Sequence, residues 1–367
     1  MALKNNDENK WTYSEHAQVK HTLMKKYLEA WIPILGSNND TIMYVDGFAG
    51  RGQYANGSDG SPLLAMQACQ EVSHFKSVRN LKFICYFVER DKDNYDNLVE
   101  VVTERRKDFP SVHSVFHENK DFDTAINELL DKTKDNLVPS FFFIDPFGYT
   151  GVPFETVKRI LSIPRTEVFF NFMFREMNRF LSVKHQEKNF DTLFGCSEWK
   201  EYIDLSGTER EHALRNLYMR RLIEENCAKY VFPFRICEDS KCSTLYYLIY
   251  ATNHFKGLAI MKSIMFNQNE HYAYLGPKEL QYQESRSQLR LFDPNVESLK
   301  TYLMKFFPKG KRITYDNILE NTFILTQSVE KHYREALKTL EKEGKIAVKR
   351  ITSKTPRGLS GNDIIIF

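Results

Sequence analysis

The sequence has few cysteines and no long apolar run. Six cysteines are scattered over 367 residues, a pattern typical of a reducing compartment and not of a disulfide scaffold. Cys237 and Cys242 are the closest pair, and no second pair completes a zinc site, so we expect no bound metal. No segment approaches the ~18 consecutive apolar residues of a membrane helix. The first residues lack the apolar core of a signal peptide, and we therefore expect a cytoplasmic protein with no membrane partner.

The chain also lacks a marked excess of either charge. Lys and Arg number 51 against 48 Asp and Glu, a formal net charge of +3, which alone is too small to indicate a nucleic-acid partner. Apolar residues make up 42% and charged residues 27%, which argues against the disordered and low-complexity classes. The length exceeds that of one ordinary domain, so we expect a large α/β domain with a smaller appendage.

Strand and helix patterns alternate along the first half of the chain. A helix is predicted over 12–35, where Val19, Leu23, Tyr27 and Trp31 recur at helical spacing. The motif Gly60-Ser61-Pro62 is expected to open a second helix, with Ser61 as its N-cap. The apolar, β-branched runs predict strands at 41–48, 81–90, 111–118, 138–147 and 166–174, with a helix after each of the first four. This alternation predicts right-handed βαβ units and a parallel sheet flanked by helices.

The rest of the chain predicts a hairpin and a second domain. A charged helical region at 175–225 precedes an antiparallel hairpin of 231–238 and 244–252, and then a helix at 258–266. After residue 290, three helical stretches ending near Gly344 precede two short strands around a basic tip, which is the pattern of a winged helix. The predicted boundaries are 1–40 for an N-terminal helical segment, 41–290 for a Rossmann-like domain and 295–367 for the winged helix.

A glycine-rich loop follows the first predicted strand. Asp46 ends the strand, and the loop continues as Gly47, Phe48, Ala49, Gly50, Arg51 and Gly52. Glycines let the backbone approach a ligand closely, and open α/β sheets bind ligands at this end of their strands. The loop therefore predicts a nucleotide-like cofactor, although its spacing is neither the dinucleotide fingerprint nor a P-loop. A tight strand-to-helix turn is the alternative.

Acidic residues also end the next two strands. Glu89 ends the second strand and is expected to accept both hydroxyl hydrogens of a ribose, although such an acid is often only a turn residue. Asp121 follows the third strand and is expected to reach an adenine amino group, with Phe122 stacking on the ring. The alternative for Asp121 is a cap on the following helix.

The fourth strand ends in Asp145-Pro146-Phe147-Gly148. The exocyclic amine of a base is a poor nucleophile because its lone pair is conjugated with the ring. The Asp145 carboxylate and the Pro146 carbonyl could accept its two N–H groups and orient the lone pair toward an electrophilic methyl group. Phe147 or Tyr149 could stack on a base flipped out of its helix. The alternative is a rigid turn made by the proline.

In order, the motifs at 46–52, 88–91, 120–122 and 145–148 resemble those of class I S-adenosylmethionine-dependent methyltransferases, over roughly residues 40–265. More narrowly, Lys20-His21, the glycine loop, Gly60-Ser61-Pro62 and the Asp-Pro-Phe-Gly motif resemble the three-Cys-motif partner (TcmP) family. The resemblance implies S-adenosylmethionine as cofactor and a partner protein with a three-cysteine, radical-SAM-like motif. The last motif also resembles the catalytic motif of tRNA guanine-N2 dimethyltransferases, which implies that Asp145-Pro146 faces the base amine. Phe147-Gly148 stands where amino-methyltransferases usually have a proline followed by an aromatic residue.

The small net charge is divided unevenly along the chain. Residues 295–367 carry +6 and residues 1–294 carry −3. A clustered basic face is the electrostatic footprint of nucleic-acid binding, and a solvated face on a protein-docking domain is the alternative. The predicted nucleic-acid contacts, on the third C-terminal helix and in the wing, are Lys331, Arg334, Lys338, Lys342, Lys354 and Arg357.

The leading hypothesis is an S-adenosylmethionine-dependent methyltransferase acting on an exocyclic amine of a nucleic-acid base, in RNA rather than DNA. One alternative is a catalytically silent or partner-dependent subunit of a nucleic-acid modification or phage-defence complex. Another is a nucleic-acid-binding protein that uses only its C-terminal domain.

Overall fold

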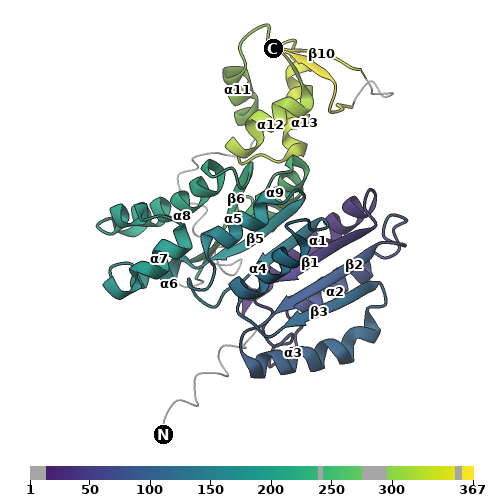
Figure 1. Ribbon diagram of the computed structural model, residues 1–367. Helices are drawn as coiled ribbons and strands as arrows, with labels where there is room; N and C mark the ends of the chain where they lie inside the picture. The colour runs from purple at the N-terminus through teal and green to yellow at the C-terminus, as the bar shows by residue number, and fades with distance from the viewer. Residues whose placement is uncertain (1–13, 239–242, 275–295, 352–357) are drawn as a thin grey trace. The chain divides into compact units, whose positions relative to one another are not determined.

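The computed structural model describes residues 14–238, 243–274, 296–351 and 358–367 (Figure 1). The chain forms two compact units. The first unit is Met1–Met261 with Ala273–Gly276, and the second is Lys262–Tyr272 with Pro277–Phe367. The helices of the described residues include none that is long and apolar enough to cross a membrane.

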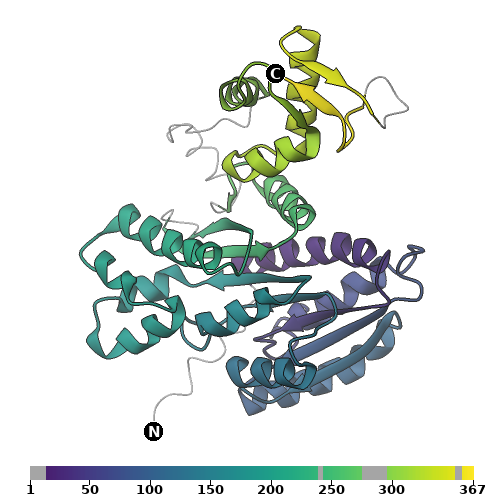
Figure 2. The ribbon, with the colours of Figure 1, turned by 45° about the horizontal axis from the view of Figure 1, so that its top comes forward.

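The first unit is built on a large, mostly parallel sheet (Figure 2). Its described strands lie in the order β3-β2-β1-β4-β5-β7-β6-β8. They are β1 (Thr41–Asp46), β2 (Lys82–Val88), β3 (Val112–Glu118), β4 (Ser140–Ile144), β5 (Thr166–Phe172), β6 (Tyr230–Cys237), β7 (Thr244–Thr252) and β8 (Ala273–Tyr274). β7 runs antiparallel to both β5 and β6. This is a Rossmann-like sheet, as the sequence predicted.

The two faces of this sheet are covered by different helices. On one face, α1 (Glu15–Gly36) lies over Tyr44 and Phe141, and it also packs on α2 (Ser61–Glu71). A continuous apolar core on the other face joins the sheet to α4 (Phe122–Thr133), α5 (Phe154–Ser162), α7 (Glu187–Phe194) and α8 (Gly207–Glu224). The remaining helices of the unit are α3 (Lys92–Arg105), α6 (Phe174–Phe180) and the first part of α9 (Phe255–Gln268), with short 3-10 turns at Arg106–Asp108, Lys184–Gln186 and Glu198–Tyr202. Burial on both faces explains why β4 is almost entirely apolar.

A buried polar cluster fixes α1 on the sheet. The Tyr27 hydroxyl donates to Glu167 Oε2 at 2.6 Å and lies 2.6 Å from the Tyr250 hydroxyl, while Thr252 donates to Glu167 Oε1 at 3.3 Å. Burial raises the pKa of Glu167 to about 7. Because these polar atoms are buried, their hydrogen bonds fix the position of α1 on the sheet more specifically than an apolar contact would.

The topology brings two sequence motifs together. The strand order reverses between β1 and β4, which are neighbours although β2 and β3 separate them in the sequence. Ligands bind at such a switch point, beyond the carboxyl ends of the strands. The glycine loop after β1 and the Asp-Pro-Phe-Gly motif after β4 both begin there.

The second unit contains three helices and a small sheet. The helices are α11 (Val296–Phe306), α12 (Tyr315–Thr322) and α13 (Glu330–Lys342), with a 3-10 turn at Phe323–Leu325, and the strands are β9 (Arg312–Thr314), β10 (Ala347–Lys349) and β11 (Ile364–Ile366). The sheet order is β10-β11-β9. The sequence predicted the helices and the last two strands. It missed β9, because a strand of three residues is too short to show an alternation of apolar and polar side chains. Gly344 follows α13 with φ +70°, as expected for a helix end.

The end of α9 belongs to this second unit. Lys262 is buried, and its ammonium donates to the carbonyls of Phe323 and Thr326 and lies 4.3 Å from the Phe323 ring centroid. Burial lowers its pKa to about 7. The carbonyl oxygens and the ring face replace part of the hydration that the ammonium loses.

Candidate active site

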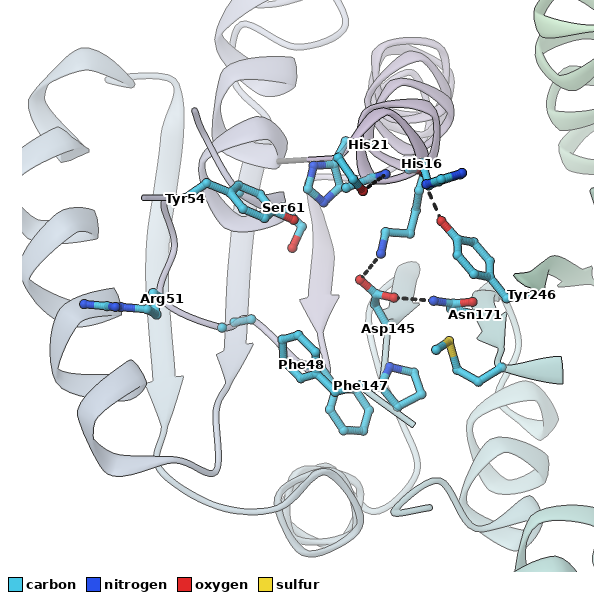
Figure 3. A pocket seen from close by; sticks show the side chains of 18 of the residues that line it. His16, His21, Phe48, Arg51, Tyr54, Ser61, Asp145, Phe147, Asn171 and Tyr246 are labelled. Atoms are coloured by element: carbon cyan, nitrogen blue, oxygen red, sulfur yellow. Dashed lines mark hydrogen bonds and ion pairs between the residues drawn. The ribbon is translucent and has the colours of Figure 1, made fainter. Parts of the chain in front are cut away.

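A cavity of about 310 Å³ opens at the switch point of the first unit (Figure 3). Its walls come from the start of α1, the glycine loop, the start of α2, the ends of β4 and β5 and the start of β7. The lining residues are Ser14, His16, Ala17, Lys20, His21, Phe48, Ala49, Gly50, Arg51, Gly52, Gln53, Tyr54, Gly60, Ser61, Asp145, Pro146, Phe147, Asn171, Met173, Arg175, Leu245 and Tyr246. The volume lies at the lower end of the range for small-molecule sites.

Asp145 is the polar centre of this cavity. Its Oδ2 forms an ion pair with the ammonium of Lys20, and its Oδ1 accepts a 2.7 Å hydrogen bond from the Asn171 amide (Figure 3). Both partners are buried, so the carboxylate is held in one orientation by a cation on α1 and an amide on β5. Each carboxylate oxygen can accept a further hydrogen bond, which leaves Asp145 able to bind a substrate N–H or O–H.

Asn171 was not among the site residues expected from the sequence, and Lys20 was noted only in the Lys20-His21 pair of the family resemblance, with no role at Asp145. Lys20 lies four residues before Met24 and seven before Tyr27 on the buried stripe of α1, and its ammonium is 5.8 Å from the Tyr246 ring centroid. Asn171 interrupts the apolar run of β5. A charged or amide residue at a position whose spacing requires burial is the signal that could have identified each of them.

His21 and His16 flank this ion pair on α1. Burial, followed by the positive charge of Lys20, lowers the pKa of His21 to about 3, so its imidazole is neutral at physiological pH. Its ring centroid lies 5.9 Å from that of Tyr54. His16 hydrogen-bonds the Cys237 carbonyl at 3.1 Å, and its own carbonyl accepts from the Tyr246 hydroxyl at 3.2 Å. These contacts tie α1 to the antiparallel end of the sheet.

The predicted acid Asp46 lies beneath the glycine loop and not in the cavity wall. Its Oδ1 accepts from the Phe48 amide at 3.2 Å and its Oδ2 from the Tyr44 hydroxyl at 3.1 Å. Burial raises its pKa to about 7, against a hydrogen bond from Ser61 that lowers it. Ser61 is the first helical residue of α2, whose N-cap is Gly60. The prediction that Ser61 is the N-cap is therefore wrong by one residue.

Two glycines of the loop are required by their surroundings. A Cβ at Gly47 would lie 2.5 Å from the Phe122 ring, and Gly52 has φ +77°. The loop can therefore adopt this close path only with glycine at these positions. Phe48, Ala49, Gly50 and Gly52 line the cavity as predicted positions in the loop, whereas Gly47 does not.

Glu89 lies beside the glycine loop. Its Oε2 accepts from the Gly50 amide at 2.9 Å and its Oε1 from the Asp91 amide at 2.7 Å. It does not line the cavity, and burial raises its pKa. Its remaining lone pairs suit ribose hydroxyls. This carboxylate and the glycine loop together fit the ribose part of S-adenosylmethionine.

Asp121 and Phe122 have structural contacts in addition to their predicted role. Asp121 is the N-cap of α4 and accepts from the Thr124 amide at 3.0 Å, the alternative that the sequence left open. Phe122 is buried, and its ring stacks on Phe48 with centroids 5.5 Å apart. Neither lines the cavity. Contacts of either residue with adenine remain predictions.

The aromatic residues of the Asp-Pro-Phe-Gly region have different surroundings. Phe147 is 62% exposed and lines the cavity, beside Pro146. Tyr149 is buried, stacks on Phe190 with centroids 4.8 Å apart, and donates to Gln186. The suggestion that Tyr149 stacks on a base is therefore wrong, because its ring already belongs to the apolar core. Phe147 remains the candidate for stacking on a base.

The basic residues predicted to bind nucleic acid lie in the second unit. Lys331, Arg334, Lys338 and Lys342 are exposed on α13, whereas Lys354 and Arg357 lie outside the described residues. Arg334 forms an ion pair with Glu330 at 2.5 Å, and Lys331 lies 5.2 Å from the Phe266 ring centroid. The α13 face is therefore partly neutralised by its own acids.

A family model described as the GMT-like wHTH domain matches residues 277–351. The second unit is a winged helix-turn-helix domain. No curated protein matches the chain. Among solved structures, the chain is similar to the methyltransferase domain of bacterial CtHen1, with TM-score 0.31 and 10% identity over 63% of this chain and 100% of that one.

A candidate S-adenosylmethionine-dependent methyltransferase from Methanococcus maripaludis is also similar, with TM-score 0.30 and 11% identity over 69% of this chain and 96% of that one. At these TM-scores neither similarity carries an argument. The Rossmann-like fold of the first unit is assigned from its own strand order and strand directions.

Proposed function

We propose that the protein is an S-adenosylmethionine-dependent methyltransferase that acts on an exocyclic amine of a nucleic-acid base, with RNA as the preferred substrate. The observation that carries the proposal is the environment of Asp145. This carboxylate ends β4 at the switch point, is oriented by Lys20 and Asn171, and shares a cavity with the glycine loop, Pro146 and an exposed Phe147.

The residues of the cavity can prepare an amine for attack. S-adenosylmethionine, when bound, would supply the electrophilic methyl group and leave as S-adenosylhomocysteine, and Asp145 would accept the proton that the amine loses on methylation. Asp145 and the Pro146 carbonyl would accept the two N–H groups of the amine, which directs its lone pair away from both acceptors. Lys20 and Asn171 fix the carboxylate, so little reorientation is required when the base arrives. Phe147 would stack on the flipped-out base.

The glycine loop and Glu89 would hold the cofactor. Glu89 would accept ribose hydroxyls beside its bond from the Gly50 amide. His21, which also lines the cavity, is neutral and adds no positive charge to it. The neutral imidazole therefore avoids repulsion with a sulfonium cation.

A ribose hydroxyl is a second candidate substrate, and the Lys20–Asp145 ion pair favours it. Attack by an oxygen nucleophile develops negative charge on that oxygen, which a nearby ammonium stabilises. Attack by a neutral amine develops no such charge. The amine remains the first candidate because Asp145 is followed directly by Pro146 and Phe147, which supply a second acceptor and a stacking face.

Radiolabelled methyl transfer to tRNA, rRNA and DNA pools tests the proposal, followed by digestion to nucleosides. We expect label in RNA, on a base, as an N-methylated nucleoside. Label on the ribose would replace the amine assignment by the hydroxyl one. Absence of transfer in every pool, with the cofactor bound, would instead favour a partner-dependent subunit of the kind implied by the three-Cys-motif partner resemblance.

A further inference from the structure

An unassigned cluster of positive charge extends from the end of α11 through the following turn to the start of β9. Lys305, Lys309, Lys311 and Arg312, here named the basic turn, are all exposed, and no acidic residue lies between them. Within the described part of the chain, none of the four forms an ion pair. The basic turn therefore presents its full charge to solvent.

The basic residues of α13 are interspersed with acidic residues. Glu330, Glu335 and Glu341 lie between its exposed basic residues, and Glu343 follows its last residue. On the helix, Arg334 forms an ion pair with Glu330, and just beyond its end Lys345 pairs with Glu343 and Arg350 binds Glu341 through two 2.7 Å hydrogen bonds. Lys331, Lys338 and Lys342 are exposed, and the described residues include no ion pair of theirs. Phosphates approaching α13 would meet these carboxylates as well as the lysines, and like charges lower the gain.

A groove of about 410 Å³ adjoins the basic turn. It is lined by Lys311, Arg312, Ile313, Thr314, Asn317, Asn321 and Ile364, which include two cations, two amides and a hydroxyl but no carboxylate. β9 forms the edge of its sheet, because its described partner is β11 alone. One side of this strand therefore has backbone groups free of sheet pairing, and cations beside amide and hydroxyl donors are the groups that proteins use on phosphates.

We propose that the basic turn and its groove bind the sugar-phosphate backbone of a nucleic acid, and that this surface contributes more to affinity than the α13 face does. The arguments are charge complementarity and a donor-rich groove without acids. The inference goes beyond the proposed catalytic function and does not depend on the chemistry at Asp145. An acidic protein segment is the other polyanion that such a surface could bind.

The test compares charge-reversal variants of the full chain in binding to fluorescent RNA, by anisotropy, between about 50 and 200 mM salt. The variants are Lys311→Glu with Arg312→Glu in the basic turn, and Lys338→Glu with Lys342→Glu on α13. A charge-matched control is Lys107→Glu with Lys188→Glu, two exposed residues of the first unit. Thermal melting confirms that each variant is folded.

We expect the basic-turn variant to lose about tenfold or more in affinity, and the magnitude of the slope of log K against log salt to fall by about 1.4–1.8, as two lost phosphate contacts require. The α13 variant should lose about threefold or less, and the control should match the wild type. Equal or greater loss for the α13 variant, or no loss for the basic-turn variant, would overturn the proposal. So would wild-type binding to polyglutamate but not to RNA.

The same samples separate this inference from the proposed catalytic function. Titration with S-adenosylmethionine should give the same affinity for the basic-turn variant and the wild type, because the altered residues do not line the cavity. Loss of RNA affinity in a chain that binds no S-adenosylmethionine would support the basic turn and reject the methyltransferase.

Discussion

Lys20 on α1 and Asp145 at the end of β4 form an ion pair across 125 positions of the sequence. The pair joins the N-terminal helix to the strand end that carries the proposed chemistry. Its cation lies on one carboxylate oxygen, and Asn171 donates to the other. The orientation of Asp145 thus depends on two elements, α1 and β5, that are distant from it in sequence.

The Lys20–Asp145 pair should be visible as an energetic coupling. Lys20→Met should lower the free energy of unfolding by about 1–3 kcal/mol, because it leaves a largely buried carboxylate without its cation. Adding Asp145→Asn to this variant should cost less than Asp145→Asn does in the wild type, and urea denaturation of the four proteins measures the difference. Strict additivity would contradict the pairing.

Asp145 should affect turnover more than cofactor binding. Asp145→Ala should reduce methyl transfer at saturating cofactor by about 10²–10³-fold, the usual cost of removing one positioned polar group. Its dissociation constant for S-adenosylmethionine should stay within about threefold of the wild type. Asp135→Ala, at an exposed acid beyond α4, is the matched control. A loss confined to cofactor affinity would show that Asp145 binds the cofactor and not the substrate.

Glu89 should determine cofactor affinity. Glu89→Gln keeps the shape of the side chain but removes its charge, and should weaken S-adenosylmethionine binding by about tenfold or more, the value of a charged hydrogen bond. Glu118→Gln is a close control, since Glu118 ends the neighbouring strand β3. Calorimetry compares the three proteins. Equal affinities would show that Glu89 does not bind the cofactor and only holds the glycine loop through its hydrogen bond from the Gly50 amide.

Asp121 should contribute to stability as the cap of α4. Asp121→Ala should lower the free energy of unfolding by about 1 kcal/mol, whereas Asp121→Ser, which keeps a capping oxygen, should lower it much less. Chemical denaturation distinguishes the two. If Asp121 also contacts adenine, both substitutions should weaken cofactor binding similarly, because neither serine nor alanine retains the carboxylate.

Glu167 should make part of the stability depend on pH. Burial raises the pKa of Glu167 from 4.5 to about 7, so its contribution is complete below pH 4.5 and is lost as the pH rises through 7. The loss should amount to about 1–3 kcal/mol. His21, whose pKa is lowered, acts in the opposite direction, since its contribution is lost as the pH falls from 6.5 toward 3. The difference between wild type and Glu167→Gln, measured by urea denaturation at pH 5 and pH 7.5, isolates the carboxyl group, and parallel stabilities would contradict this account.

The sheet of the first unit was predictable because its strands are buried on both faces. Apolar runs such as that of β4 can form little else when glycine or proline bounds them. β8 and β9 were missed because two or three residues show no periodicity. The start of α2 was misplaced by one residue because the Ser61 side chain bonds Asp46, a contact that only the folded chain provides.

The candidate site was predictable only in part. The glycine loop and the Asp-Pro-Phe-Gly motif are local, so the sequence shows them directly. The partners of Asp145 come from α1 and β5, and no spacing rule links them to β4. Tyr149 was misjudged for the same reason, because its burial depends on Phe190, which follows 41 positions later.

Isothermal titration of the full chain with S-adenosylmethionine and S-adenosylhomocysteine tests the central claim most directly. The account predicts saturable binding of both at one site per chain, weakened by Glu89→Gln and nearly unchanged by Asp145→Ala. Absence of binding by either molecule to the folded protein would contradict a cofactor site at this switch point, and with it the proposed methyl transfer.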